Sequence, residues 1–128
     1  MSAGTILLVE DGEALRLLVQ ELLESAGYTV LAADAPDKAL SIVQSTPGPI
    51  HLVLTDMVMP RMNGQELAKR IALLKPEARF VFMSGYSDQA MGDPGTPEPG
   101  ALFLQKPFTI DALMRTIRQA LDAGLPTP

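Results

Sequence analysis

Cysteine and tryptophan are absent from this 128-residue sequence, and histidine occurs once. The absence of cysteine excludes disulfide bonds and thiolate metal sites. A single histidine excludes any cluster of histidine ligands. Aromatic residues make up only 5% of the chain, which argues against the aromatic platforms on which nucleic-acid bases stack.

Basic residues are also scarce, with 10 lysines and arginines against 15 acidic residues and a net charge of −5. This balance argues against a nucleic-acid or anionic-membrane surface, because both need a basic face. No apolar run approaches the roughly 20 residues of a membrane helix. The N-terminus lacks a basic region and a cleavage site. We therefore expect a cytoplasmic domain that contacts neither membrane nor nucleic acid.

Short apolar runs alternate with helical patterns along the chain, and the length suits one domain spanning 1–128 with a core of about 4–124. Runs of four to six apolar residues are typical of strands buried on both faces. The predicted strands are Thr5–Glu10, Tyr28–Ala33, His51–Asp56, Arg79–Met83 and Ala101–Leu104. The single histidine therefore begins the third strand, and we expect it at the surface.

The segments between these strands carry apolar residues at helical spacing. Asn63 and Glu66 resemble an N-cap and its capping-box partner. Strands that alternate with helices indicate βαβ units, a parallel sheet and helices on both of its faces. The predicted inward faces are Leu15, Leu18, Val19, Leu22 and Ala26; Ala39, Leu40 and Val43; Leu67, Ile71 and Leu74; and Ile110, Leu113, Met114, Ile117 and Leu121.

The segment between the fourth and fifth strands interrupts this alternation. Residues 92–100 contain three prolines and three glycines, which an ordinary helix does not tolerate. We predict that the fourth helix is cut to about one turn, Ser87–Met91, or is replaced by a loop.

Polar residues follow the predicted strands at the edge where open parallel sheets bind ligands. Glu10 and Asp11 follow the first strand, Asp56 ends the third, Ser84 follows the fourth and Lys106 follows the fifth. Three close carboxylates repel one another unless a cation lies between them. Mg²⁺ prefers oxygen ligands and also binds phosphate oxygens, so the pattern predicts a magnesium site.

Four motifs carry a resemblance to a known family: VED at Val9–Asp11, LTDMVMP at Leu54–Pro60 followed by Asn63-Gly64, MSGYSD at Met83–Asp88, and QKPF at Gln105–Phe108. With these motifs the chain resembles the receiver domain of two-component response regulators, and most of all the receivers of hybrid sensor histidine kinases. The resemblance implies a flavodoxin-like (βα)5 fold, α/β and doubly wound, with a five-stranded parallel sheet in the order 2-1-3-4-5.

The resemblance also implies a role for each residue at the sheet edge. Asp56 matches the phosphoacceptor, and Asp11 a direct ligand of Mg²⁺, for which Mn²⁺ can substitute. Glu10 would act on the metal through water, and the backbone carbonyl of Val58 would be a further ligand. Ser84 matches the switch hydroxyl. Lys106 matches the lysine that pairs with the phosphate, and its peptide bond to Pro107 is expected to be cis. Phe103 occupies the position of the aromatic switch residue.

The resemblance implies that the domain accepts a phosphoryl group from a phosphohistidine on a histidine kinase or a histidine phosphotransfer domain. The isolated domain would be no enzyme beyond catalysing its own phosphorylation, although a parent hybrid kinase would be a transferase. We expect a monomer or weak dimer. Val58 cannot orient an attacking water, so we expect slow autodephosphorylation. For Phe103 the alternative is a plain core residue that never moves.

Three other functions are compatible with parts of the pattern. A phosphohydrolase of the haloacid dehalogenase type also uses an aspartate and Mg²⁺, but its second aspartate is replaced here by Val58. A flavin mononucleotide binder of the same fold needs a first loop that cradles phosphate, whereas this loop is acidic. A scaffold that no longer accepts phosphate would not need the Asp11, Asp56, Ser84 and Lys106 set.

Overall fold

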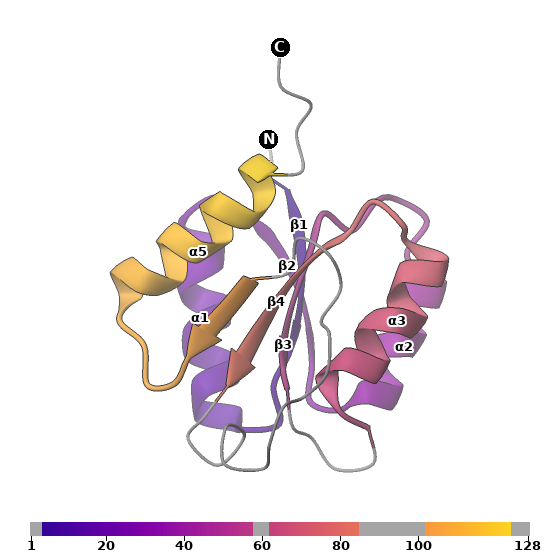
Figure 1. The fold of residues 1–128 in the computed structure, drawn as a ribbon, viewed down its shortest axis with the longest axis horizontal. Coiled ribbons are helices and arrows are strands. Elements are labelled where there is room, and N and C mark those ends of the chain that lie inside the picture. The colour runs from indigo at the N-terminus through magenta and orange to yellow at the C-terminus, as the bar shows by residue number, and fades with distance from the viewer. Residues whose placement is uncertain (1–3, 58–61, 85–101, 124–128) are drawn as a thin grey trace.

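The computed structural model describes residues 4–57, 62–84 and 102–123 and contains one parallel sheet in the order β2-β1-β3-β4-β5 (Figure 1). This confirms the fold class and the strand order. The strands are β1 (Thr5–Val9), β2 (Thr29–Ala33), β3 (Leu52–Asp56), β4 (Arg79–Ser84) and β5 (Leu102–Gln105). The helices are α1 (Glu13–Ser25), α2 (Pro36–Ser45), α3 (Gly64–Leu74) and α5 (Ile110–Ala123).

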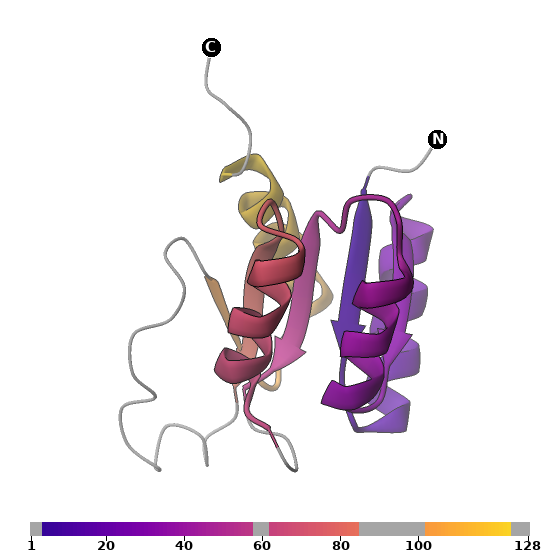
Figure 2. The same cartoon turned by 90° about the vertical axis from the view of Figure 1, so that its right-hand side faces the viewer.

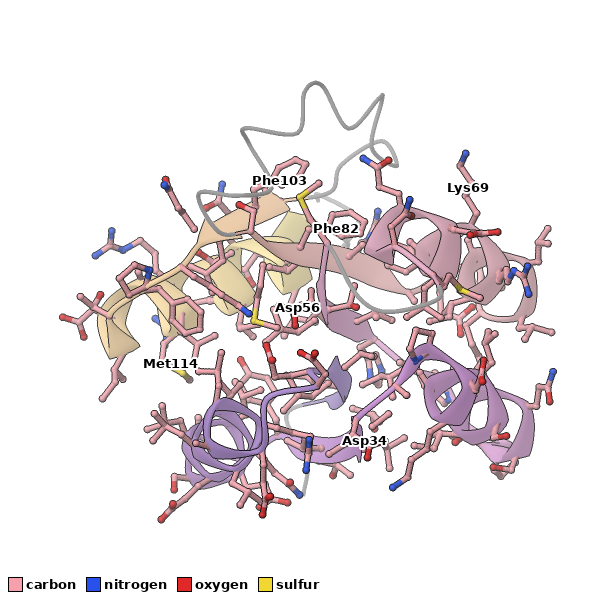
Figure 3. All side chains as sticks on the ribbon, turned by 90° about the horizontal axis from the view of Figure 1, so that it is seen from below. Asp34, Asp56, Lys69, Phe82, Phe103 and Met114 are labelled. Atoms are coloured by element: carbon pink, nitrogen blue, oxygen red, sulfur yellow. The ribbon has the colours of Figure 1, made fainter. Side chains whose placement is uncertain are left out.

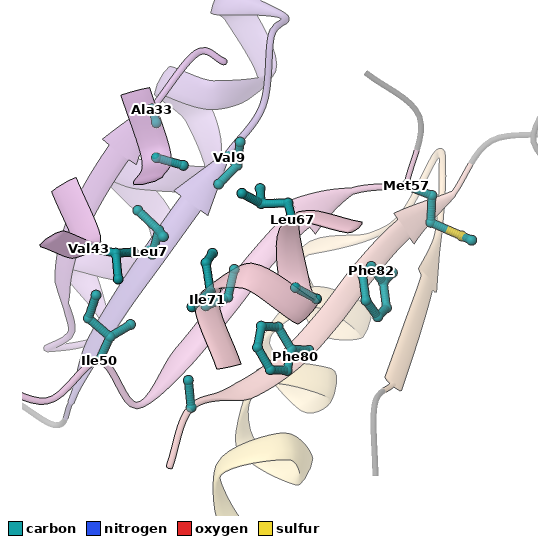
Figure 4. Close-up of a cluster of buried hydrophobic side chains, with 14 residues drawn as sticks. Leu7, Val9, Ala33, Val43, Ile50, Met57, Leu67, Ile71, Phe80 and Phe82 are labelled. Carbon is teal, nitrogen blue, oxygen red and sulfur yellow. The ribbon is translucent and has the colours of Figure 1, made fainter. Parts of the chain in front are cut away.

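The helices form two layers, with α1 and α5 on one face of the sheet and α2 and α3 on the other (Figures 1 and 2). Alternate residues of each strand point to opposite faces. In β1, Leu7 and Val9 pack toward α2 and α3, whereas Ile6 and Leu8 pack toward α1 and α5. Figure 4 shows the first of these two cores. Because β1 and β3 are buried on both faces, they hold the residues that follow them in fixed positions.

Local signals set the starts of two helices, and the start at Asn63 is the predicted one. The Asn63 side chain accepts a hydrogen bond of 2.8 Å from the Glu66 N–H and caps α3. The Glu66 carboxylate accepts from Arg70 one turn later. Pro36 occupies the first turn of α2, where its missing N–H costs no helical hydrogen bond.

Three of the predicted inward faces need correction. Leu18 of α1 is 51% exposed and Leu74 of α3 is 47% exposed. Ile110, the first residue of α5, is 56% exposed. In α1 the buried positions are Val19 and Leu23, so the inward face is rotated away from Leu18 and from the exposed Ala26. Leu74 lies in the last turn of α3, beyond the part of the helix that covers the sheet.

The sole histidine, His51, is exposed directly before β3, at the opposite end of that strand from Asp56. Its Nδ1 accepts a hydrogen bond of 2.9 Å from the Thr5 N–H. Its surface position is as predicted, although β3 begins one residue later than expected. The predicted shortening of the fourth helix, Ser87–Met91, lies outside the described residues. Within the described part of the chain, no helix is long and apolar enough to cross a membrane.

The corrected face of α3 gives a stability prediction. Ile71 is fully buried, whereas Leu73 on the same helix is 86% exposed. We expect Ile71→Ala to lower the free energy of unfolding by about 2–5 kcal/mol, because it leaves a cavity under the helix. The matched change Leu73→Ala should alter it by less than about 0.5 kcal/mol. Urea unfolding of both variants measures this, and equal losses would contradict the assigned face.

Candidate functional site

The carboxyl ends of β1 and β3 bring three carboxylates together. In the sheet register Val9 lies opposite Thr55, so the residues that follow each of them, Glu10 and Asp56, are neighbours. One carboxylate oxygen from each of Glu10, Asp11 and Asp56 lies within 4.8 Å of the others. Glu10 and Asp56 are buried, at 3% and 5% exposure, while Asp11 faces solvent. Figure 3 views this edge from below, with Asp56 near its centre.

Lys106 supplies the positive charge of the site. Its Nζ lies 2.5 Å from Asp56 Oδ1 and 2.9 Å from Glu10 Oε1, so one ammonium pairs with both buried carboxylates. The Lys106 backbone N–H donates to the Ser84 carbonyl at 2.7 Å, which ties the end of β5 to the end of β4. The Lys106–Pro107 peptide bond is cis, as the resemblance implied.

Glu10 contacts the protein through every polar group that it carries. Its Oε2 accepts from the Gly12 N–H at 2.8 Å, and its Oε1 accepts from Lys106. Its backbone N–H donates to Ala33, and its carbonyl accepts from Arg16 Nη1 at 3.1 Å. A contact between Glu10 and a metal through water stays a prediction. What the structure adds is that Glu10 holds both the turn before α1 and the site lysine.

Arg16 is the residue near the site that the sequence analysis missed. It lies one turn into α1, and its guanidinium reaches back to the chain at the acidic pair. A charge pattern could have indicated it, since Arg16 is the first basic residue after Glu10 and Asp11.

The two buried carboxyl groups differ in how readily they lose a proton. Burial raises the pKa of Asp56 to about 7, the ion pair with Lys106 opposes this increase, and Glu10 adds to it. For Glu10 burial also acts to raise the pKa, but hydrogen bonds from Asp56, the Gly12 N–H and Lys106 outweigh it and keep the pKa low. Burial acts to lower the pKa of Lys106, and its two carboxylate partners raise it overall.

The donor set fits a hard divalent cation. Three carboxylates share one ammonium, so two negative charges are left over when all four groups are ionised. Burial is the main cause of the raised pKa of Asp56, and the nearby Glu10 carboxylate adds to it. A cation that binds oxygen ligands, such as Mg²⁺, would neutralise the excess negative charge. The proposed third protein ligand, the Val58 carbonyl, lies outside the described residues.

The predicted switch residues lie on β4 and β5, the two strands that follow β3 in the sheet. Ser84 ends β4 and is 7% exposed. Phe103 of β5 is 46% exposed, and its ring centroid lies 5.7 Å from that of Phe82 (Figure 3). The alternative that Phe103 is a core phenylalanine is therefore wrong, because nearly half of the residue faces solvent. Whether Phe103 moves stays a prediction.

The raised pKa of Asp56 predicts how stability depends on pH. Between its ordinary pKa of 3.8 and about 7, the folded protein keeps a proton that the unfolded chain has lost. Ionised Asp56 therefore destabilises the metal-free fold increasingly as the pH rises through this range. We expect Asp56→Asn to be more stable than wild type at about pH 8 in a chelator, with the difference shrinking as the pH falls. Urea unfolding across this range measures it.

A lower stability of Asp56→Asn at the alkaline end would contradict this prediction. It would show that the attraction between Asp56 and Lys106 outweighs the cost of burying the charge. Asp34→Asn is the matched control, since Asp34 follows the neighbouring strand β2 and is exposed.

Comparison with known proteins shows which family this sequence matches. Residues 6–118 match the response regulator receiver domain. The chain is 35% identical over 120 residues to sensor kinase CckA of Brucella abortus (strain 2308), which covers 94% of this chain but 13% of the kinase. It is 36% identical over 119 residues to the response regulator receiver protein CpdR of the same strain, which covers 93% of this chain and 98% of CpdR.

A solved structure agrees with these sequence matches. The receiver domain of the hybrid histidine kinase CckA superposes with a TM-score of 0.79 at 33% identity, over 92% of this chain and 99% of that one. Together with the carboxylates and lysine at the sheet edge, these matches show that the chain belongs to the response regulator receiver domain family of two-component signalling.

Proposed function

We propose that this domain accepts a phosphoryl group on Asp56 from a phosphohistidine of a histidine kinase or a histidine phosphotransfer domain. The observation that carries the proposal is the buried Asp56 carboxylate, paired with Lys106 inside a cluster of three carboxylates. An isolated surface aspartate would have neither the fixed orientation nor the excess negative charge that calls for a metal.

The proposed transfer forms an acyl phosphate. An Asp56 carboxylate oxygen attacks phosphorus, the new O–P bond forms, and the P–N bond to the donor imidazole breaks with its electron pair leaving on nitrogen. Such reactions depend on positioning and on neutralising charge. Mg²⁺, when bound by Asp11 and its neighbours, would supply positive charge to the phosphoryl oxygens.

Lys106 and Ser84 would then stabilise the product. Lys106 Nζ pairs with Asp56 in this structure and can pair with a phosphoryl oxygen on the same side chain afterwards. Its second bond, to Glu10, keeps the ammonium in place during that exchange. The Ser84 hydroxyl, at the end of the neighbouring strand, would donate to another oxygen, and Phe103 could follow it inward. The proposed switch would shift an existing equilibrium between two conformations.

The partner part of the proposal rests on an apolar groove beside Lys106. The groove has a volume of about 490 Å³ and lies between α1 and the segment that leads from β5 into α5. Leu18 and Ile110, which line it, are each more than half exposed. Because Lys106 lines the groove and also pairs with Asp56, a partner seated there would reach the acceptor. We propose an amphipathic helix of the phosphodonor as its occupant.

The central prediction concerns a covalent phosphoryl adduct on Asp56. Incubation of the domain with acetyl phosphate and Mg²⁺ should add one phosphoryl group, seen as a single adduct by intact-protein mass spectrometry. Asp56→Asn should abolish the adduct, since an amide cannot form the acyl phosphate. A chelator should suppress it in wild type. Absence of an adduct in wild type would instead favour a scaffold, and continued release of free phosphate would favour a hydrolase.

The groove gives a second prediction, which separates docking from chemistry. Leu18→Ser should slow transfer from a phosphorylated kinase or phosphotransfer domain that serves the wild-type chain, because it removes apolar contact area from the groove. The same variant should react with acetyl phosphate at the wild-type rate. Leu73→Ser is the matched control, an exposed leucine on α3 away from the groove. Equal transfer rates for all three proteins would exclude the groove as the docking site.

A further inference from the structure

Helix α3 begins directly against the peptide that follows Asp56. Its first residue, Gly64, donates its N–H to the Met57 carbonyl at 2.7 Å. An ideal Cβ built on Gly64 would lie 2.2 Å from the Asp56 carbonyl oxygen and 3.1 Å from both the Asp56 carbonyl carbon and the Met57 Cα. Real Cβ atoms essentially never come closer than 3.0 Å to another heavy atom. Only glycine therefore fits where α3 meets the end of β3.

This requirement comes from space and not from backbone conformation. Among the described residues, the glycines with positive φ are Gly4 and Gly27, whereas Gly64 is helical. Replacement of a helical glycine by alanine ordinarily stabilises a helix. At Gly64 the methyl group would instead have to push α3 and the Asp56 peptide apart by about 0.8 Å to restore 3.0 Å.

We propose that Gly64 is a positioning residue for phosphoryl transfer: its missing side chain lets α3 seat against the Asp56 carbonyl and so sets where the acceptor carboxylate lies. The inference rests on the proposed function for its consequence, but the contact itself is a property of the fold. No group of Gly64 would touch the phosphoryl group or the metal.

The surrounding contacts direct the displacement toward Asp56. On the helix side, Leu67 and Ile71 are fully buried in the core, which resists movement of α3. On the strand side, the Thr55 hydroxyl donates to the Asp56 carbonyl at 3.1 Å, and the Met57 N–H donates to Met83 at 2.9 Å. The Asp56 carbonyl oxygen is the atom nearest the added methyl group, so we expect the Asp56 peptide to tilt.

A tilt of this peptide changes the site, because the Asp56 side chain shares its Cα. Asp56 Oδ1 lies 2.5 Å from Lys106 and belongs to a cluster only 4.8 Å across. A displacement of less than 1 Å is large on this scale. Misplacement of a reacting group by about 1 Å can slow a reaction about a hundredfold.

The test compares three alanine or glycine exchanges with wild type. Gly64→Ala adds the methyl group at the contact. Gly48→Ala adds the same methyl group where no heavy atom lies within 4 Å. Ala68→Gly weakens the same helix α3 at a buried position without adding any atom. Each protein is assayed for Mg²⁺ affinity by calorimetry and for its phosphorylation rate with acetyl phosphate at saturating Mg²⁺.

We expect Gly64→Ala to bind Mg²⁺ more weakly and to phosphorylate about a hundredfold more slowly. Gly48→Ala should match wild type in both measurements. Ala68→Gly should lose stability in urea but keep the wild-type rate once folded, which separates a positional effect from a general loss of stability. A wild-type rate and Mg²⁺ affinity in Gly64→Ala would overturn the inference.

Partial unfolding of Gly64→Ala, or failure of wild type to gain a phosphoryl group, would still test the inference. If Gly64→Ala is partly unfolded, trimethylamine N-oxide restores the folded state, and a rate that then recovers fully would overturn the positioning role. If wild type itself gains no phosphoryl group, the proposed function fails. Weaker Mg²⁺ binding in Gly64→Ala alone would still support the placement of the carboxylate, and unchanged binding would contradict it.

Discussion

The ion pair between Lys106 and two buried carboxylates is the interaction on which the site depends. Glu10 and Asp56 are almost completely removed from water, and burial of unpaired charge is too costly for a small domain. One ammonium cannot neutralise both of them together with Asp11. The fold therefore carries a residual negative charge at this edge of the sheet, which a hard divalent cation would neutralise.

The sheet makes this arrangement possible because parallel strands end at a common edge. β1 and β3 are adjacent and covered on both faces, so Glu10 and Asp56 leave the sheet with little freedom. Lys106 arrives from the far strand β5, and its backbone bond to Ser84 fixes the approach. Helix α3 packs against the end of β3 at Gly64, whose N–H donates a hydrogen bond to the Met57 carbonyl. Residues that follow β1 and β5, together with the first residue of α3, thus fix the position of the carboxylate at the end of β3.

Sequence reasoning put Asp56, Asp11, Glu10, Ser84 and Lys106 at the carboxyl edge of the sheet, where the structure has them, because a strand end can be read from where an apolar run stops. It could not find the contacts of Arg16 and Gly12 with Glu10, since these depend on how the turn after β1 folds. It misassigned Leu18, Leu74 and Ile110, because helical periodicity gives the spacing of an apolar stripe but not its edges. The exposed Leu18 belongs to the groove beside Lys106, so the error coincides with the proposed docking surface.

The length of the Glu10 side chain has a consequence for Lys106. One carboxylate oxygen caps the Gly12 N–H and the other holds Lys106, so the two bonds use separate atoms. An aspartate, shorter by one methylene, would have to give up one of the two or shift the turn before α1. With glutamate, Lys106 would keep one partner if Asp56 formed the proposed acyl phosphate. The lysine would then exchange only its second bond, from carboxylate to phosphoryl oxygen, and the ammonium would never be buried unpaired.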